Sequence, residues 1–443
     1  MRIESPRHSR AGGNDELLFA APQHKTQLMP AAQLKSPSSK VPGQTEFVLL
    51  ISSVMMLVAF AIDSMLPALP AIGLSLRVAD PADQPLVISA FLIGFSLALL
   101  FIGTISDRYG RRWLMLASLI GFVVMSISAA VAPSFEILLM ARGAQGMAAA
   151  GGQVLVRAVV RDKFEGRAMA QIMSLAGMIF MAGPIIAPSM GQAVLAVGPW
   201  RWIFIVLAAL GFCVWTWAFF RLPETLPAEK RTPINIKAVS ANAKVVLSDR
   251  LSVGYTLAMT AAASALFGFL MSVQPIFGRT FNSADMLPTG FAIMAGGMMG
   301  ASLLNAVIVK RYGMRLIGHG ALIVFTLVAG IHAFVAWSGR ETLESFIILQ
   351  MIMMMAFPMM GGNFNAMAME RMGSVAGTAS SLQGFANNLI SAIVGTIIGR
   401  AFDGTTVPLY VAYFICGALA LIIVFVTERG QLFVARHAPT PAE

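Results

Sequence analysis

Twelve long apolar stretches dominate this sequence of 443 residues. Each is close to the roughly 18 to 25 residues that a helix needs to cross about 30 Å of hydrocarbon. With 57% hydrophobic and only 12% charged residues, the chain is too apolar for a surface exposed to water. The predicted membrane spans are residues 47–68, 85–105, 113–132, 135–158, 169–196, 201–221, 252–275, 287–309, 314–337, 344–368, 376–400 and 407–427.

The pattern within these stretches predicts the fold class. They are continuously apolar rather than alternating, and lipid offers no partner to an unpaired backbone, so helices are expected rather than a barrel. We therefore predict an all-α integral membrane protein with two six-helix halves, 47–221 and 251–428, joined by a cytoplasmic linker, 222–250. Within the linker, "INIKAVSANAKVVL" (234–247) is either a helix on the membrane surface or a solvated loop.

The distribution of basic residues predicts the orientation. When alternate loops are assigned to two sides, most of the 31 Lys and Arg residues fall on the side of the N-terminus. Such an excess marks the cytoplasmic side, so both termini are predicted there, with a mobile tail of residues 1–46 and a short tail of residues 429–443. This topology explains the net charge of +10 without nucleic acid. The exceptions are Arg77, Arg201, Arg279, Arg340 and Arg400 in the opposite loops, and Arg142 and Arg157 within the fourth span.

A basic hexapeptide occurs twice, as "DRYGRR" (107–112) and as "KRYGMR" (310–315). Both copies fall in the loop between the second and third span of a half. This shared register favours an internal duplication over chance similarity between two basic loops. Two halves related by a repeat, with a substrate path between them at mid-membrane, are the arrangement in which rocking gives alternating access.

The stretch "GTISDRYGRRWLML" (103–116) resembles the loop signature of the major facilitator superfamily. An Asp at a helix end can pair with Arg across a domain boundary when that face is closed, although Asp107 alternatively only balances a positive loop. Lys310 replaces this acid in the second copy, so we expect the switchable network to be centred on Asp107. The resemblance implies a conformational gate formed by Gly103, Asp107, Arg108, Gly110, Arg111 and Arg112.

An arginine lies within the fourth span, in "ARGAQGMAAAGG" (141–152). An intramembrane arginine is costly unless it faces a cavity or a partner. The stretch resembles a signature of proton-coupled drug antiporters of the same superfamily, in which Arg142, Gln145 and Gly146 match. Glu136 is a candidate partner, and the alternative is an Arg142 side chain that extends to the outer interface.

The fifth span, "GMIFMAGPIIAPSMGQ" (177–192), is interrupted by glycine and proline. It resembles the signature of the antiporter class but departs from it at Ala187-Pro188, and this resemblance favours export. Such helices also bend and pack closely for purely structural reasons. The interrupting residues are Gly177, Gly183, Pro184, Pro188 and Gly191.

The first span contains a carboxylate, Asp63, in "FAIDSMLPALPAIG" (60–73). An apolar environment favours the protonated carboxyl group, which releases its proton when water or a cation arrives, so Asp63 and Arg142 are our candidates for proton coupling. Alternatively, Asp63 fixes the helix end. This segment and "AGTASSLQGF" (376–385) resemble the Bcr/CflA drug-resistance subfamily.

Polar residues within spans are candidates for a substrate cavity, namely Gln145, Gln274, Asn363 and Asn387, although packing between helices is the commoner role. The Met-rich run at 351–372 suits varied apolar ligands or Cu(I), with ordinary packing as the simpler reading. His319 and His332 stand near opposite ends of the ninth span, so we expect no metal site and no cofactor.

The sequence lacks a phosphate-binding loop and any constellation of acid, base and nucleophile, so neither an ATP-driven pump nor an enzyme is expected. We predict a monomeric transporter of the bacterial inner membrane that exports small amphiphilic compounds or drugs in exchange for protons. A transporter of one specific metabolite and a copper transporter that uses the Met-rich run are the alternatives.

Overall fold

The computed structural model describes residues 43–231 and 235–434, in which all regular structure is helical. The predicted terminal tails therefore fall largely outside the described residues. The first helices are α1 (Gln44–Asp63), α2 (Leu69–Ser75), α3 (Leu86–Tyr109), α4 (Arg111–Ala130), α5 (Phe135–Lys163), α6 (Gly166–Val197) and α7 (Arg201–Arg221). They are followed by α8 (Ile236–Ser248), α9 (Arg250–Pro275), α10 (Leu287–Tyr312), α11 (Met314–Trp337), α12 (Leu343–Met369), α13 (Ala376–Arg400) and α14 (Val407–Thr427).

Eleven of the predicted spans each correspond to one long helix, whereas the first, 47–68, comprises α1 and a short helical turn after Asp63; the predicted all-α membrane fold is confirmed. In the described part of the chain, eleven helices are long and apolar enough to cross a membrane. The exception is α5, whose 29 residues are sufficient in length but include Arg142, Arg157 and many Ala and Gly residues. Because α5 packs extensively against α3 and α4, protein rather than lipid surrounds much of it.

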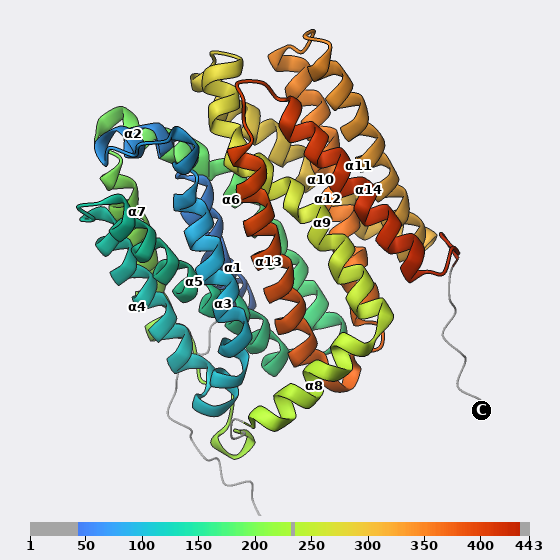
Figure 1. Ribbon diagram of the computed structural model, residues 1–443. Helices are drawn as coiled ribbons and strands as arrows, with labels where there is room; N and C mark the ends of the chain where they lie inside the picture. Colours follow the sequence, from blue (N-terminus) through green and yellow to red (C-terminus); the bar gives the residue numbers. More distant parts are fainter. Residues whose placement is uncertain (1–42, 232–234, 435–443) are drawn as a thin grey trace, which may run out of the picture. The chain divides into compact units, whose positions relative to one another are not determined.

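The helices form two groups, which we call the first half (α1–α7) and the second half (α9–α14) (Figure 1). In the first half α3 packs on α5, α4 on α5 and α7, and α1 on α6; in the second half α9 packs on α13 and α14, and α12 on α10 and α11. The two halves meet where α3 packs against α13 and where α6 packs against α10. Small residues and continuous apolar surfaces make these contacts close, as is usual in membranes.

Glycine allows the backbones of α3 and α5 to touch. A Cβ on Gly94 would lie 1.9 Å from the carbonyl oxygen of Gly143, and one on Gly146 would lie 2.0 Å from the carbonyl oxygen of Phe91. Any side chain at Gly94 or Gly146 would therefore push the two helices apart. This close approach brings Arg142 of α5 within reach of the α3 backbone.

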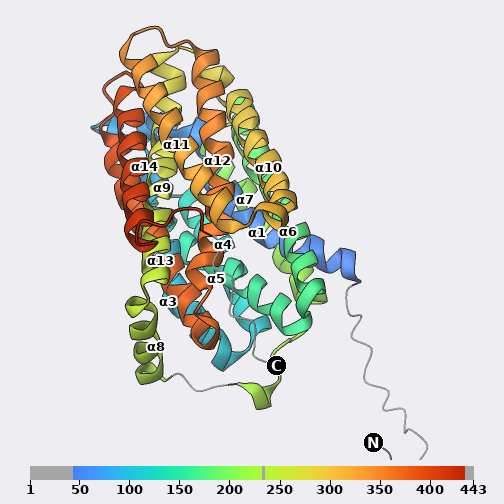
Figure 2. The ribbon, with the colours of Figure 1, turned by 90° about the vertical axis from the view of Figure 1, so that its right-hand side faces the viewer.

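The linker contains a helix, α8, rather than a loop. Val246 of α8 is buried against Met372, which precedes α13, and Ala379, in the first turn of α13. The linker helix therefore packs on the second half at the end of the bundle where α13 starts (Figure 2).

Candidate functional site

The "DRYGRR" loop is a tight turn between α3 and α4. Because α3 ends at Tyr109 and α4 begins at Arg111, Gly110 alone makes the connection, with a φ of 98°. This backbone conformation is strained for residues that carry a Cβ. A Cβ on Gly110 would also lie 2.5 Å from Glu224 Oε2. The turn therefore requires glycine for two independent reasons.

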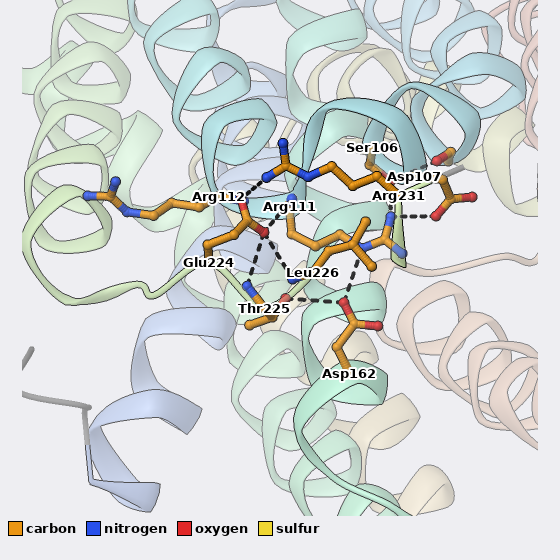
Figure 3. Close-up of polar contacts among 10 residues, drawn as sticks. Ser106, Asp107, Arg111, Arg112, Asp162, Glu224, Thr225, Leu226 and Arg231 are labelled. Carbon is orange, nitrogen blue, oxygen red and sulfur yellow. Dashed lines mark hydrogen bonds and ion pairs between the residues drawn. The ribbon is translucent and has the colours of Figure 1, made fainter. Parts of the chain in front are cut away.

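Glu224, in the segment that follows α7, holds the start of α4 (Figure 3). Its carboxylate accepts hydrogen bonds from the backbone N–H groups of Arg111 at 2.9 Å and Arg112 at 3.3 Å. The first N–H groups of a helix have no partner within the helix and form the positive end of its dipole, so a carboxylate stabilises them. The Arg112 guanidinium donates to the carbonyl oxygens of Leu222 and Phe219. The loop is thus tied to the end of α7 through both its backbone and its side chains.

Arg111 is the centre of the ion pairs in this loop and is only 3% exposed. Its guanidinium pairs with Asp107 at 2.7 Å and with Asp162, in the last turn of α5, at 3.1 Å, and it also donates to Ser106 Oγ (Figure 3). Thr225 Oγ1 donates a further hydrogen bond to Asp162. The ion-pair partner of Asp107 therefore lies in its own loop.

The packing of α3 against α13 brings the Asp107 end of α3 toward the start of α13. The two helices run antiparallel, and extending their register by one turn beyond Gly103 predicts that Asp107 faces the first turn of α13. The N-terminus of a helix attracts a carboxylate. The contacts that define the register are an ion pair of Asp83 with Arg400, a hydrogen bond of 2.7 Å between Ser89 Oγ and Thr396 Oγ1, and Gly103, whose Cβ would lie 3.7 Å from Ser381 Oγ.

The second half has a network of its own around Arg315. Gly313 makes the corresponding turn with a φ of 80°, and Arg315, two residues later, is 6% exposed. Its guanidinium pairs with Glu370 at 3.1 Å and with Glu428, directly after α14, at 3.0 Å. Tyr255 Oη donates a hydrogen bond of 2.5 Å to Glu428 Oε1. Glu224, Glu370 and Glu428 were not among the predicted site residues, although each follows a predicted span within three residues.

The first residues of the two hexapeptides, Asp107 and Lys310, differ in their ion pairing. Lys310 is exposed and forms no ion pair within the described residues, whereas Asp107 is paired with Arg111. Arg108 is also exposed and lies over the ring of Tyr109, 5.3 Å from its centroid. Of the predicted gate residues, Asp107, Gly110, Arg111 and Arg112 are therefore brought together, and Arg108 lies outside that cluster.

Arg142 is completely buried in the first half. Its guanidinium donates to the carbonyl oxygens of Val87 at 3.0 Å and Ala61 at 2.9 Å, and to Gln145 Oε1 at 2.5 Å. It also lies over the ring of Phe91, 4.6 Å from the centroid. Carbonyl oxygens near the end of a helix lack partners within the helix, and Ala61 is the third-last residue of α1. Arg142 therefore stabilises the end of α1.

The predicted partner of Arg142 is not its partner in the structure. Glu136 is exposed, and across residues 43–231 and 235–434 no carboxylate pairs with Arg142. The side chain does not extend to an interface either, since it is buried by α1 and α3. Gln145, proposed for the cavity, instead links Arg142 to Ser126 Oγ, to which its amide donates at 2.6 Å.

Asp63 is the last residue of α1 and is 5% exposed. No hydrogen-bond or ion-pair partner of its carboxyl group occurs among the residues that the structure describes. It lies two residues after Ala61, whose carbonyl oxygen binds Arg142. The structure therefore brings both predicted coupling residues to the end of α1 but does not pair them.

The predicted motif in α6 packs against α1. A Cβ on Gly183 would lie 2.8 Å from Ala59 Cβ, and one on Gly191 would lie 2.2 Å from the carbonyl oxygen of Ser64. Gly177 has open space around it. The motif thus contacts the segment that contains Asp63. Both of its prolines, Pro184 and Pro188, lie inside the continuous helix α6.

The remaining cavity candidates are dispersed. Asn363 is 3% exposed and donates to Asn305 Oδ1 at 3.0 Å, which is a packing contact between α12 and α10. Asn387 of α13 is half-buried, and its Oδ1 atom has no partner. Gln274 lines a cavity of about 140 Å³ between the halves, at the end opposite Asp107. These residues do not converge on one pocket.

Comparison with known proteins gives a consistent result. The family model described as Major Facilitator Superfamily matches residues 51–396. An uncharacterized MFS-type transporter, YdgK, of Bacillus subtilis is 30% identical over 82% of this chain and 90% of its own length. A bicyclomycin resistance protein homolog of Haemophilus influenzae is 26% identical over 87% of this chain and 96% of its own length. The multidrug resistance protein MdtL of Salmonella heidelberg is 25% identical over 89% and 98%.

Two solved structures share the fold. The xylose transporter XylE from E. coli, in a partially occluded inward open conformation, has a TM-score of 0.69 at 12% identity, covering 89% of this chain and 99% of that one. The human organic anion transporter MFSD10 has a TM-score of 0.64 at 19% identity, covering 87% and 100%. At these identities the likeness concerns the fold alone.

Proposed function

Because the chain belongs to the Major Facilitator Superfamily, and is thus a multi-pass membrane transporter, we propose that it exports small amphiphilic compounds in exchange for protons. The drug-resistance names of several relatives support the substrate class. We place it in a bacterial inner membrane with both termini in the cytoplasm, since the basic residues gather on that side.

The observation that carries this proposal is the buried carboxyl group of Asp63 at the end of α1. A carboxylate in this setting is costly unless it is protonated or approached by a cation. Among the described residues Asp63 has no hydrogen-bond or ion-pair partner, whereas Arg142 donates to the carbonyl oxygen of Ala61, two residues before Asp63. Asp63 is therefore available to exchange a proton against a substrate, and Arg142 holds the helix end in position.

The Asp107 loop is our proposed gate. Asp107 lies opposite the N-terminus of α13 while its ion pair with Arg111 and the bonds from Glu224 keep the loop rigid. Separation of the halves at this end would remove Asp107 from the α13 dipole. The gate therefore acts through a helix end rather than through an ion pair between the halves.

Transport in everted vesicles tests this function. Adding bicyclomycin or a lipophilic fluorescent cation under an imposed pH gradient is expected to release protons from vesicles that contain the protein. Asp63→Asn should abolish this release while substrate binding remains, because the amide cannot exchange a proton. Asp403→Asn, at an exposed loop carboxylate that accepts hydrogen bonds from Thr405, is the matched control and should transport normally. Unchanged proton release in Asp63→Asn would exclude Asp63 from coupling.

A further inference from the structure

A second buried titratable group lies in the second half, at the end of the bundle opposite the Asp107 loop. His332 of α11 is fully buried, and its Nε2 atom lies 2.6 Å from Oε1 of Glu341, in the loop between α11 and α12. The Glu341 side chain is 7% exposed. Its other oxygen accepts a hydrogen bond from Thr406 Oγ1, directly before α14. The pair therefore connects three elements.

Aromatic and uncharged groups surround the pair in the part of the chain that the structure describes. From α14, Tyr410 stacks on the His332 ring with centroids 3.4 Å apart, and its Oη atom donates to Gln350 of α12. From α12, Phe346 contributes an apolar ring edge. Within the described ranges, no Lys or Arg pairs with Glu341. A neutral imidazole beside an ionised Glu341 would thus leave one uncompensated negative charge in an apolar site.

One ring nitrogen of His332, Nδ1, has no hydrogen-bond partner among the described residues. If the neutral ring donates its Nε2 proton to Glu341, Nδ1 presents a lone pair, and this atom is buried without a hydrogen-bond partner. A proton added at Nδ1 converts the pair into an imidazolium and a carboxylate, which together carry no net charge. Burial favours this state over an isolated charge.

His319, the other described histidine, shows the opposite arrangement. Its Nδ1 atom accepts a hydrogen bond from the backbone N–H of Phe433, and its Nε2 atom lies 3.0 Å from Tyr255 Oη. The nearby carboxylate, Glu428, is already paired with Arg315. His319 thus has neither a vacant nitrogen nor an uncompensated carboxylate beside it.

We propose that His332 and Glu341 form a second proton-binding site, distinct from Asp63, which takes up one proton from the side of the membrane opposite the Asp107 loop. The bound proton resides on Nδ1 of His332. When it is bound, the neutral pair holds the loop after α11 against the start of α14. This site does not depend on the proposed antiport, because proton binding here requires no substrate.

Nitrogen NMR of the full chain in lipid nanodiscs tests the proposal. The protein has five histidines, so labelling the imidazole nitrogens gives few signals, and substitution of each histidine by Gln assigns them. Over a pH range from about 5 to 9, which brackets the usual imidazole titration, His332 should convert between imidazolium and neutral ring. His319 should stay neutral throughout.

The variant Glu341→Gln keeps the shape of the side chain and removes the charge. At about pH 6 the imidazolium signal of His332 should fall at least about tenfold, because its counter-charge is gone. A His332 ring that stays neutral in the wild type, or that titrates alike in Glu341→Gln, would overturn the site. If Glu341→Gln does not fold, the wild-type spectra decide alone, since His319 is the control within the same sample. Failure of antiport in vesicles would leave this titration unaffected.

Discussion

The loop at Asp107 and the loop at Lys310 share a glycine turn and an arginine two residues after that glycine. Each is also held by a glutamate that follows the last helix of its half. In the first half, the half-exposed Glu224 binds backbone N–H groups of α4. In the second half, Glu428 is 1% exposed and forms an ion pair with Arg315.

This difference shows how two loops of similar sequence are held in different ways. An exposed carboxylate on a helix terminus is easily separated from its partners, whereas a buried ion pair is costly to break. We infer that the first loop moves as one rigid unit away from the second half during transport, and that the second loop stays in place. The following substitutions test this comparison in order of their expected effect on stability.

The largest loss should come from Arg315→Met. It removes the guanidinium that faces the buried carboxylate of Glu428, and such a change costs about 3–5 kcal/mol. The equivalent change in the first half, Arg112→Met, removes hydrogen bonds to two carbonyl oxygens and should cost about 1–3 kcal/mol. Thermal unfolding in detergent measures both. Equal losses would contradict the distinction between a fixed loop and a changing one.

The two turn glycines should differ by a smaller amount. Gly313→Ala has open space around the new Cβ, so only the positive φ costs about 1 kcal/mol. Gly110→Ala meets Glu224 as well and should lose about 2–3 kcal/mol, because the carboxylate must leave the α4 N-terminus. The measurement is again the unfolding midpoint. A larger loss for Gly313→Ala would show that Glu224 does not fix the first turn.

Substitutions at the first residue of each hexapeptide should change stability least. At these positions the two loops should differ in transport instead. Asp107→Asn weakens the attraction to the α13 N-terminus, which is worth up to ~2 kcal/mol and so shifts a conformational equilibrium by up to about thirtyfold. Lys310→Gln should leave transport unchanged, because Lys310 is exposed and forms no ion pair in the part of the chain described. Substrate efflux from vesicles measures both. Equal transport by the two variants would mean that both loops serve topology alone.

The helices could be predicted from the sequence, but the hydrogen-bond partners of the site residues could not. Continuous apolar runs predict spans well because lipid requires internal backbone pairing, and α7, α11, α13 and α14 begin and end at the predicted residues. The hydrogen-bond partners of Arg142 were beyond prediction. Apart from Gln145, they are carbonyl oxygens of α1 and α3, and backbone acceptors carry no signal in residue type.

The sequence predicts that the two loops differ, but it does not reveal the glutamates that hold each loop. The change from Asp107 to Lys310 is visible in the sequence, but Glu224 and Glu428 stand more than a hundred residues from the loops that they hold. Only the fold brings them together. A regularity was available, since an acid follows the sixth and the twelfth predicted span, and comparing those two positions would have indicated both anchors.

α3 contains Asp107 near one end and Val87, whose carbonyl oxygen binds Arg142, near the other. Between these two ends, Gly94 of α3 and Gly146 of α5 allow the backbones of the two helices to lie in direct contact. We therefore expect that a displacement of the Asp107 loop tilts α3 as a whole and so moves Arg142 and the end of α1. We therefore expect α3 to couple the proposed gate to the carboxyl group of Asp63, and we expect this coupling to depend on the absence of side chains at Gly94 and Gly146.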